Sequence, residues 1–349
     1  MIPRPRPEIE ALPAYRPPRE RPRILLHANE SPYPLPDEVR AHVMQELSRA
    51  DLHRYPDGES TALRGQIAAY CGVDPDWIWV GSGSNEVLLN AALAFGGQGR
   101  SALLFEPTYA MHRRQAVIAG TTASVVPRGR DFRLDVSAAV DEIQTHDPAL
   151  VFLASPDNPT GVLTEPDDVA RLASAGSGLL VLDEAYHEFC GVTFLPRLRE
   201  FQNVMVVRTL SKAFRLAGVR VGWAVAHPDV IAWLVRVRMP YGQSVLAQTT
   251  ARVVLENRKA VLAHVDEIVA ERDRIAEALA ASGAEVFGSR ANFVLFRPRD
   301  AESLLARLSG AGILIRDFRT TPYLEGCLRV TAGRPEENEE FLEVVASSA

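Results

Sequence analysis

The chain has 349 residues, of which 47% are hydrophobic and 23% charged, so we expect a globular protein with a substantial core. The formal net charge of −6 gives no general reason to expect a nucleic acid or an anionic membrane as partner. The cysteines Cys71, Cys190 and Cys327 are far apart and form no C-x-x-C pair. That spacing argues against a disulfide framework or a zinc knuckle and fits a reducing cytoplasm. No apolar run approaches the ~20 residues that a membrane helix needs.

Residues 1–30 are expected to form an N-terminal arm. Seven prolines lie between Pro3 and Pro22, which excludes an amphipathic transit helix there. The segment contains arginines but no apolar stretch of the kind found in a secretory signal. We therefore predict an extended arm that lies over the body of the protein or over a partner subunit.

Residues 31–255 alternate between apolar runs and helical patterns, which predicts one large α/β domain. Most of the runs are continuously apolar, as in strands buried on both faces of a mainly parallel sheet that helices cover. Segments 85–95 and 165–175 are predicted to be crossover helices. The predicted strands are 77–80, 101–105, 123–126, 149–154, 178–183, 203–208 and 220–226.

Residues 256–349 are predicted to form a linking helix and a small α+β domain. The helix is expected over 256–282, with apolar residues such as Val261 and Ile268 on one side and Gly283 at its end. The remaining predicted elements are strands at 291–297, 312–317 and 326–331 and helices at 301–310 and 335–347.

Lys212 lies in the segment T-L-S-K-A-F-R, directly after the predicted strand 203–208. A lysine partly withdrawn from water has a lowered pKa, so its neutral amine can form a Schiff base with a carbonyl group. Ser211 and Arg220 flank Lys212 and are suited to binding a phosphate. In isolation, the segment fits an ordinary surface loop equally well.

Asp183 ends the apolar run G-L-L-V-L-D, at the end of a strand where open α/β sheets bind ligands. A carboxylate there is costly unless it is paired. The N–H of a pyridinium ring is a suitable partner, because the ion pair keeps the ring an effective electron sink. Tyr186 could donate a hydrogen bond to a phenolate oxygen on such a ring. The alternative for Asp183 is a helix cap or a salt bridge at the edge of the core.

The segment G-S-G-S-N-E at 81–86 follows one strand and begins an apolar helix, as in sites where backbone N–H groups bind phosphate. A dinucleotide-binding motif would carry a third glycine where Glu86 stands, so a cup for a single phosphate is the better interpretation. Asn158, in S-P-D-N-P-T-G, can bond to a ring oxygen, and Tyr109, in E-P-T-Y, can stack on a ring. A plain turn and a core tyrosine are the alternatives. Since these segments all follow predicted strands, we expect them to converge on one edge of the sheet.

Together these segments resemble the histidinol-phosphate aminotransferases, a branch of the fold-type I pyridoxal-phosphate enzymes. The matching segments are A-N-E-S-P-Y at 28–33, H-R-Y-P-D, A-S-P-D-N-P-T-G, V-L-D-E-A-Y-H-E-F, R-T-L-S-K-A-F and L-R-V-T-A-G-R-P-E-E-N. The resemblance covers nearly the whole chain. It implies an α/β fold with a seven-stranded mainly parallel sheet, a small C-terminal domain, pyridoxal 5′-phosphate as cofactor and a homodimer.

The resemblance also implies a role for each matching residue. Lys212 would carry the cofactor and move the proton, and Asp183 would pair with the pyridine nitrogen. Tyr186 and Asn158 would hold the ring oxygen, and Tyr109 would stack on the ring. The residues implied for the cofactor phosphate are Ser84, Asn85, Ser211 and Arg220, with Tyr55 reaching it from the other subunit. Those implied for the substrate are Asn29, Arg329 and Arg316, although Arg316 fits a surface ion pair with Asp317 almost equally well.

The implied reaction moves the amino group of L-histidinol phosphate to 2-oxoglutarate, giving imidazole-acetol phosphate and glutamate. Two features depart from the branch: M-P-Y-G-Q-S at 239–244 replaces a common P-Y-N-V-N form near the substrate, and Arg215 stands where a small residue is frequent. An aminotransferase for aromatic or other biosynthetic amino acids is therefore an alternative. A cofactor-binding regulator is disfavoured because Lys212 and Asp183 are both present, and a nicotinamide oxidoreductase because the glycine pattern is incomplete.

Overall fold

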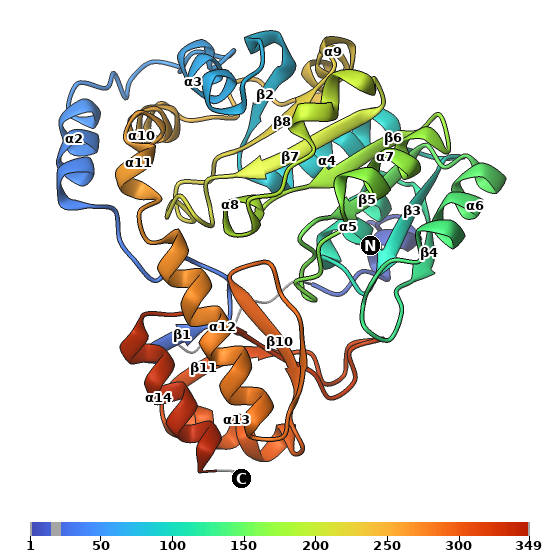
Figure 1. The fold of residues 1–349 in the computed structure, drawn as a ribbon. Helices are drawn as coiled ribbons and strands as arrows, with labels where there is room; N and C mark the ends of the chain where they lie inside the picture. Colours follow the sequence, from blue (N-terminus) through green and yellow to red (C-terminus); the bar gives the residue numbers. More distant parts are fainter. Residues whose placement is uncertain (1, 15–21, 348–349) are drawn as a thin grey trace.

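Two β-sheets organise the chain, each in its own lobe (Figure 1). The structure is a computed structural model, and it describes residues 2–14 and 22–347. The larger lobe contains seven strands, and the smaller lobe, mostly orange and red in Figure 1, contains five. None of the helices within these described ranges combines the length and hydrophobicity that a membrane crossing requires.

The large sheet has the strand order β2-β8-β7-β6-β5-β3-β4. Its strands are β2 (Ile78–Gly81), β3 (Ser101–Glu106), β4 (Thr122–Pro127), β5 (Leu150–Ala154), β6 (Leu179–Asp183), β7 (Val204–Thr209) and β8 (Gly222–Ala226). Strand β8 is antiparallel to both of its neighbours, and the other described pairs are parallel. The prediction of a seven-stranded, mainly parallel sheet is confirmed, and each strand lies close to its predicted range.

Helices cover both faces of this sheet, which explains why its strands are continuously apolar. Strands β5, β6 and β8 are buried along their whole length. One face packs against α4 (Ser84–Phe95), α5 (Ala110–Ile118) and α9 (Pro228–Val237). The other packs against α2 (Asp37–Leu47), α3 (Thr61–Cys71), α6 (Val136–His146), α7 (Pro166–Ser174) and α10 (Val245–Glu256). Each large apolar side chain buried in these layers contributes roughly 1.5–3 kcal/mol relative to an exposed one.

The prediction of one continuous helix over 256–282 is wrong. After α10, the chain forms α11 (Arg258–Val261) and then α12 (Val265–Ala281), and the backbone leaves the helical conformation at Asn257 and His264. Val261 packs in the core of the large lobe, whereas Ile268 packs in the core of the small lobe. The break follows from this, because one straight helix cannot turn its apolar side toward two different cores.

The small sheet has the order β1-β11-β12-β10-β9. Its strands are β1 (Ile24–Leu26), β9 (Glu285–Phe287), β10 (Phe293–Arg297), β11 (Ile313–Asp317) and β12 (Leu328–Thr331). Helices α12, α13 (Ala301–Gly310) and α14 (Pro335–Ala346) supply its main core. Strand β1 lies within the segment predicted to be an arm, yet it pairs in parallel with β11. The N-terminal segment therefore contributes a strand to the C-terminal sheet.

The described start of the chain lies against the large lobe. A one-turn helix, α1 (Pro7–Glu10), contacts α5. Arg6 donates to the carbonyl oxygen of Ile118 at 2.6 Å, and Arg114 donates to that of Pro13 at 2.8 Å. The rest of the proline-rich part of the predicted arm, residues 15–21, lies outside the described residues.

Candidate active site

The predicted site residues come from loops at one edge of the large sheet. Tyr109 follows β3, Asn158 follows β5, Asp183 ends β6 and Lys212 follows β7. Ser84 begins α4 after β2, and Arg220 precedes β8, which runs in the opposite direction. Because carboxyl ends of parallel strands meet at the same edge, the topology brings these side chains together.

Lys212 is held on the small-lobe side of this edge. Its Nζ donates a hydrogen bond to the carbonyl oxygen of Ala28 at 2.9 Å and lies 5.8 Å from the centre of the Tyr186 ring. Burial, and then the positive charge of Arg329, lower the pKa of Lys212 to about 8. A neutral amine is therefore far more accessible at Lys212 than at an ordinary surface lysine.

Asp183 is a nearly fully buried carboxylate at the end of β6. One oxygen accepts a hydrogen bond from the backbone N–H of Ala185 at 3.1 Å, and the other lies 3.4 Å from Nε2 of His112. Among the described residues, no lysine or arginine forms an ion pair with Asp183, and its close basic neighbour is the buried His112. A buried carboxylate in this state suits a ligand that presents a protonated nitrogen.

Close backbone packing forms a cup at the start of α4. Gly83 has a φ of +78°, and a Cβ added there would lie 2.3 Å from Nη2 of Arg220. A Cβ at Gly222 would lie 2.3 Å from the backbone nitrogen of Ser84. Arg220 in turn donates to the hydroxyl of Ser211 at 3.1 Å. Helix N–H groups, a guanidinium and a hydroxyl thus surround one point, which is the composition of a phosphate site.

The remaining predicted ring contacts are joined by hydrogen bonds. The Tyr109 hydroxyl donates to Oδ1 of Asn85 at 3.1 Å, and Nδ2 of Asn29 donates to the Tyr186 hydroxyl at 2.9 Å. Asn158 accepts a hydrogen bond from Arg329, which lies on β12 of the small sheet. The site is therefore built from both lobes.

Comparison with known proteins assigns a family to this arrangement. A family model described as Aminotransferase class I and II matches residues 21–345. The chain belongs to the class I and II aminotransferases.

Relatives of this aminotransferase are similar to it over almost their full length. A histidinol-phosphate aminotransferase of Thermobifida fusca is 42% identical over 337 residues, with 93% of this chain and 90% of that protein covered. A histidinol-phosphate aminotransferase of Corynebacterium glutamicum is 38% identical over 352 residues, with 98% and 95% covered. The crystal structure of histidinol-phosphate aminotransferase from Sinorhizobium meliloti, in complex with pyridoxal-5′-phosphate, has a TM-score of 0.89 at 27% identity and covers 98% of each chain. These similarities confirm the resemblance inferred from the motifs.

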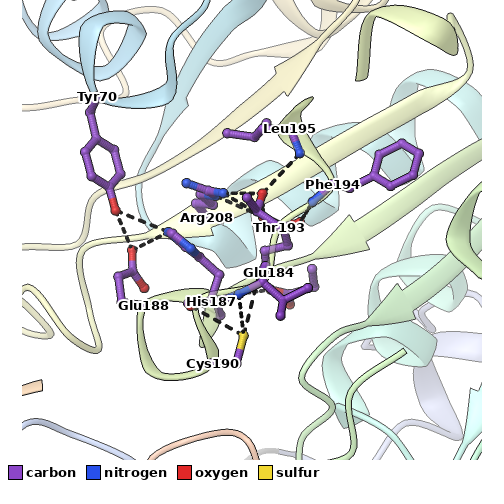
Figure 2. Close-up of polar contacts among 12 residues, drawn as sticks. Tyr70, Glu184, His187, Glu188, Cys190, Thr193, Phe194, Leu195 and Arg208 are labelled. Atoms are coloured by element: carbon purple, nitrogen blue, oxygen red, sulfur yellow. Dashed lines mark hydrogen bonds and ion pairs between the residues drawn. The ribbon is translucent and has the colours of Figure 1, made fainter. Parts of the chain in front are cut away.

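This aminotransferase also contains a buried ion pair directly behind Asp183 that was not predicted from the sequence. Figure 2 shows Glu184 facing Arg208, whose Nε and Nη2 lie 3.1 and 2.8 Å from one carboxylate oxygen. The hydroxyl of Thr193 and the backbone N–H of Phe194 also donate to Glu184, at 2.8 and 2.7 Å. The pair ties the end of β6 to β7, the strand that leads to Lys212. A signal existed in the sequence: Glu184 directly follows the apolar strand β6, and Arg208 is a charged residue within the apolar strand β7.

A second polar cluster lies beside this pair on the chain after β6 (Figure 2). Nε2 of His187 lies 2.9 Å from a carboxylate oxygen of Glu188 and 3.2 Å from the hydroxyl of Tyr70, which also donates to Glu188 at 3.2 Å. His187 and Glu188 belong to the short helix α8 (His187–Cys190). The cluster joins that helix to α3 and so supports the loop that carries Tyr186 in this aminotransferase.

The small lobe presents two arginines on one face of its sheet. Arg316 on β11 and Arg329 on β12 are directly opposite in an antiparallel pair, so they point to the same side. Their guanidinium groups lie 5.6 and 5.5 Å from the ring centre of Phe318. Asp317, the partner considered for Arg316, pairs instead with Arg319 at 3.1 Å, and Arg316 forms no ion pair with any described residue. Two like charges placed this way are suited to a shared anion.

Tyr55 is not joined to the rest of the site within one chain. Its side chain is 80% exposed, and its ring stacks on Tyr241 with the centres 4.5 Å apart. No hydrogen bond or ring contact among the described residues links Tyr55 to the other predicted site residues of this aminotransferase.

Proposed function

We propose that this chain is a pyridoxal-phosphate-dependent aminotransferase that moves the amino group of L-histidinol phosphate to 2-oxoglutarate. One observation carries the proposal: a lysine with a lowered pKa, a buried aspartate and a phosphate cup meet at one sheet edge, opposite a pair of arginines. The relatives named above support the same activity.

The side chains present fit pyridoxal 5′-phosphate. Ser84, Asn85, Ser211 and Arg220 would hold its phosphate at the start of α4, and Asp183 would face its ring nitrogen. Tyr186 and Asn158 would hold the ring oxygen, and Tyr109 would cover a ring face. When bound, the cofactor supplies an electron sink that makes the α-proton of an amine substrate acidic.

Lys212 is the residue proposed to move that proton. Its pKa of about 8 leaves a useful fraction of neutral amine near physiological pH, so it can take a proton as a general base and return it as a general acid. The carbonyl oxygen of Ala28 orients Nζ through the hydrogen bond at 2.9 Å. The negative charge of Asp183 would keep a proton on the ring nitrogen throughout.

The two opposed arginines are the reason to favour a phosphorylated donor. A phosphate monoester carries close to two negative charges near neutral pH, and Arg316 and Arg329 offer two guanidinium groups on one face. The second carboxylate of 2-oxoglutarate can occupy the same place in the other half of the reaction. An aromatic amino acid lacks such an anion at its side chain.

The decisive experiment compares kcat/KM for L-histidinol phosphate and for L-phenylalanine at a fixed concentration of 2-oxoglutarate. Since a hydrogen bond to a charged group contributes about 1.5–3 kcal/mol, we expect the phosphorylated donor to be preferred by about 10- to 100-fold or more. Inorganic phosphate should compete with this donor. A preference for phenylalanine would instead assign the chain to the aromatic alternative.

We also propose that the enzyme is a homodimer of the cytoplasm. Several large apolar side chains are exposed near Tyr55, including Leu52 at 68% and Met239 at 70%, and a second copy of the chain would cover them. In such a dimer, Tyr55 would reach the partner's phosphate cup. Sedimentation velocity with Leu52→Asp tests this surface: we expect the variant to dissociate, and an unchanged mass would refute the interface. The free cysteines are consistent with a reducing compartment.

A further inference from the structure

Arg215 lies three residues after Lys212 and contacts both segments that join the two lobes. Within residues 22–347, the chain passes between the lobes twice. The first passage is residues 27–36, from β1 to α2, and the second is residues 257–264, from α10 through α11 to α12. Figure 1 shows the two passages, blue and orange, on the same side of the molecule.

The first passage is held through its backbone and one ring. Nη1 of Arg215 donates to the carbonyl oxygen of Pro34 at 2.8 Å. The guanidinium carbon lies 5.6 Å from the ring centre of Tyr33, within the range of a cation–π contact. Arg334 of the small lobe binds the same stretch by donating to the carbonyl oxygen of Pro32 at 3.1 Å.

The second passage is held at His264, the residue that precedes α12. Nη2 of Arg215 lies 2.8 Å from Nδ1 of His264. A guanidinium group has donors and no acceptor, so Nδ1 must accept and the ring proton must be on Nε2. The ring of Tyr33 also contacts that of His264, with the centres 4.2 Å apart. One cluster, called here the hinge cluster, is therefore formed by Arg215, Tyr33 and His264. It binds both passages to the loop that carries Lys212.

The backbone of Arg215 has a conformation that favours glycine. Its φ is +63°, a left-handed conformation that disfavours a side chain by roughly 1–2 kcal/mol and that glycine adopts freely. Burial also lowers the pKa of the guanidinium group, so the charge is partly withdrawn from water. A glycine would avoid both penalties, which points to a role for the arginine side chain itself.

The first passage continues directly into the candidate site. Ala28 accepts the hydrogen bond of Lys212, and Asn29 donates to Tyr186. Arg329, one of the two proposed anion-binding arginines, donates to the carbonyl oxygen of His27 at 2.7 Å. Movement of this passage would therefore change the position of Arg329 relative to Lys212.

We propose that Arg215 is a positioning residue for substrate binding: by fixing both passages, it sets the distance between Lys212 in the large lobe and Arg316 and Arg329 in the small lobe. This inference rests on the proposed function insofar as it concerns the substrate. The hinge cluster itself does not depend on that function, because all of its contacts lie within the chain.

The test uses Arg215→Gly, which removes the side chain and relaxes the backbone, and a matched pair at the other end of the contact. His264→Leu removes the acceptor, whereas His264→Gln keeps an acceptor oxygen for Arg215. In cofactor-free protein, we expect Arg215→Gly and His264→Leu to speed amide hydrogen exchange in peptides covering 27–36 and 258–266. His264→Gln should exchange like the parent.

With cofactor bound, the same variants should change the KM of the amine donor much more than kcat. We expect the KM of the amine donor to rise by about 10-fold in Arg215→Gly and His264→Leu, with kcat changed by less than about 3-fold. Arg215→Gly loses the hydrogen bonds to both passages and His264→Leu loses the one to the second passage, so the lobe that carries Arg329 is held less firmly. Cofactor affinity should not fall. Parent-like exchange and KM in Arg215→Gly would overturn the proposal, as would loss of cofactor binding with an unchanged KM. If the proposed substrate were wrong, the hydrogen-exchange result would be unchanged. The parent would then also have a high KM for that donor.

Discussion

The two lobes differ in how charged side chains are arranged on their sheets. At the edge of the large sheet, Glu184 and Arg208 neutralise each other and are further bound by Thr193 and the backbone. On the small sheet, Arg316 and Arg329 lie directly opposite each other on β11 and β12 and point to the same side. A compensated pair stabilises a fixed framework, whereas two like charges opposite each other on neighbouring strands favour an anion beside them. The comparison indicates that the large lobe holds the residues proposed for proton transfer in fixed positions, and that the small lobe recognises the substrate.

The largest effect is expected from removing the amine of Lys212, which the comparison assigns to the chemistry of the large lobe. The sequence contains two lysines, Lys212 and the exposed Lys259. Because proton transfer and covalent attachment both depend on Lys212, Lys212→Ala should lower turnover by at least about 10³-fold, and borohydride treatment should leave no cofactor mass on the protein. Lys259→Ala is the control and should behave like the parent. Full activity in Lys212→Ala would refute the assignment.

The buried pair can be tested through the free energy of unfolding. Arg208→Leu leaves the Glu184 carboxylate buried without its cation, so we expect a loss of about 3–5 kcal/mol in urea denaturation. Combining Arg208→Leu with Glu184→Leu should recover a large part of that loss, because no charge then remains buried. If the double variant were as unstable as the single one, the packing of Arg208 rather than its charge would carry the stability.

The small lobe should respond differently to the loss of an arginine. Arg329→Ala should raise the KM of the phosphorylated donor by about 10- to 100-fold while cofactor affinity stays the same, and Arg316→Ala should act in the same direction. Inorganic phosphate should raise the thermal midpoint of the parent more than that of either variant. Equal KM values in the parent and in Arg329→Ala would contradict the inference that the small lobe recognises the substrate.

The smallest expected effect is a dependence of stability on pH in the cofactor-free protein. The pKa of Lys212 falls from 10.5 in the unfolded chain to about 8 in the folded one, so between these values the unfolded chain binds more protons. The contribution of Lys212 to stability is therefore absent below about pH 8 and grows as the pH rises toward 10. We expect roughly 1 kcal/mol over this window, since the residue keeps some solvent contact. The measure is the parent minus Lys212→Met, because buried tyrosines and cysteines act in the opposite direction at high pH. A difference that does not change with pH would contradict the lowered pKa.

The sequence by itself determined the elements whose signal is local. Long apolar runs specify buried parallel strands, since such strands have no polar face, and this held for the central strands β3, β5, β6 and β7. Strand β8 is buried but antiparallel, and the edge strand β4 is only partly buried. The loops that carry Lys212, Asp183 and Asn158 were located for the same reason, because they end those runs. The segment G-S-G-S-N-E at 81–86 indicated the cup at the start of α4, and the structure shows the close backbone packing there at Gly83.

The tertiary structure decided what depends on residues far apart in the chain. Strand β1 has three residues and no periodicity that could reveal its pairing with β11. The break between α11 and α12 arises because two separate cores compete for one apolar pattern. The register of β11 and β12 places Arg316 opposite Arg329. The packing of the two lobes brings Arg215 into contact with Pro34 and His264. Register and lobe packing are set by the sum of many distant contacts, so no short segment contains them.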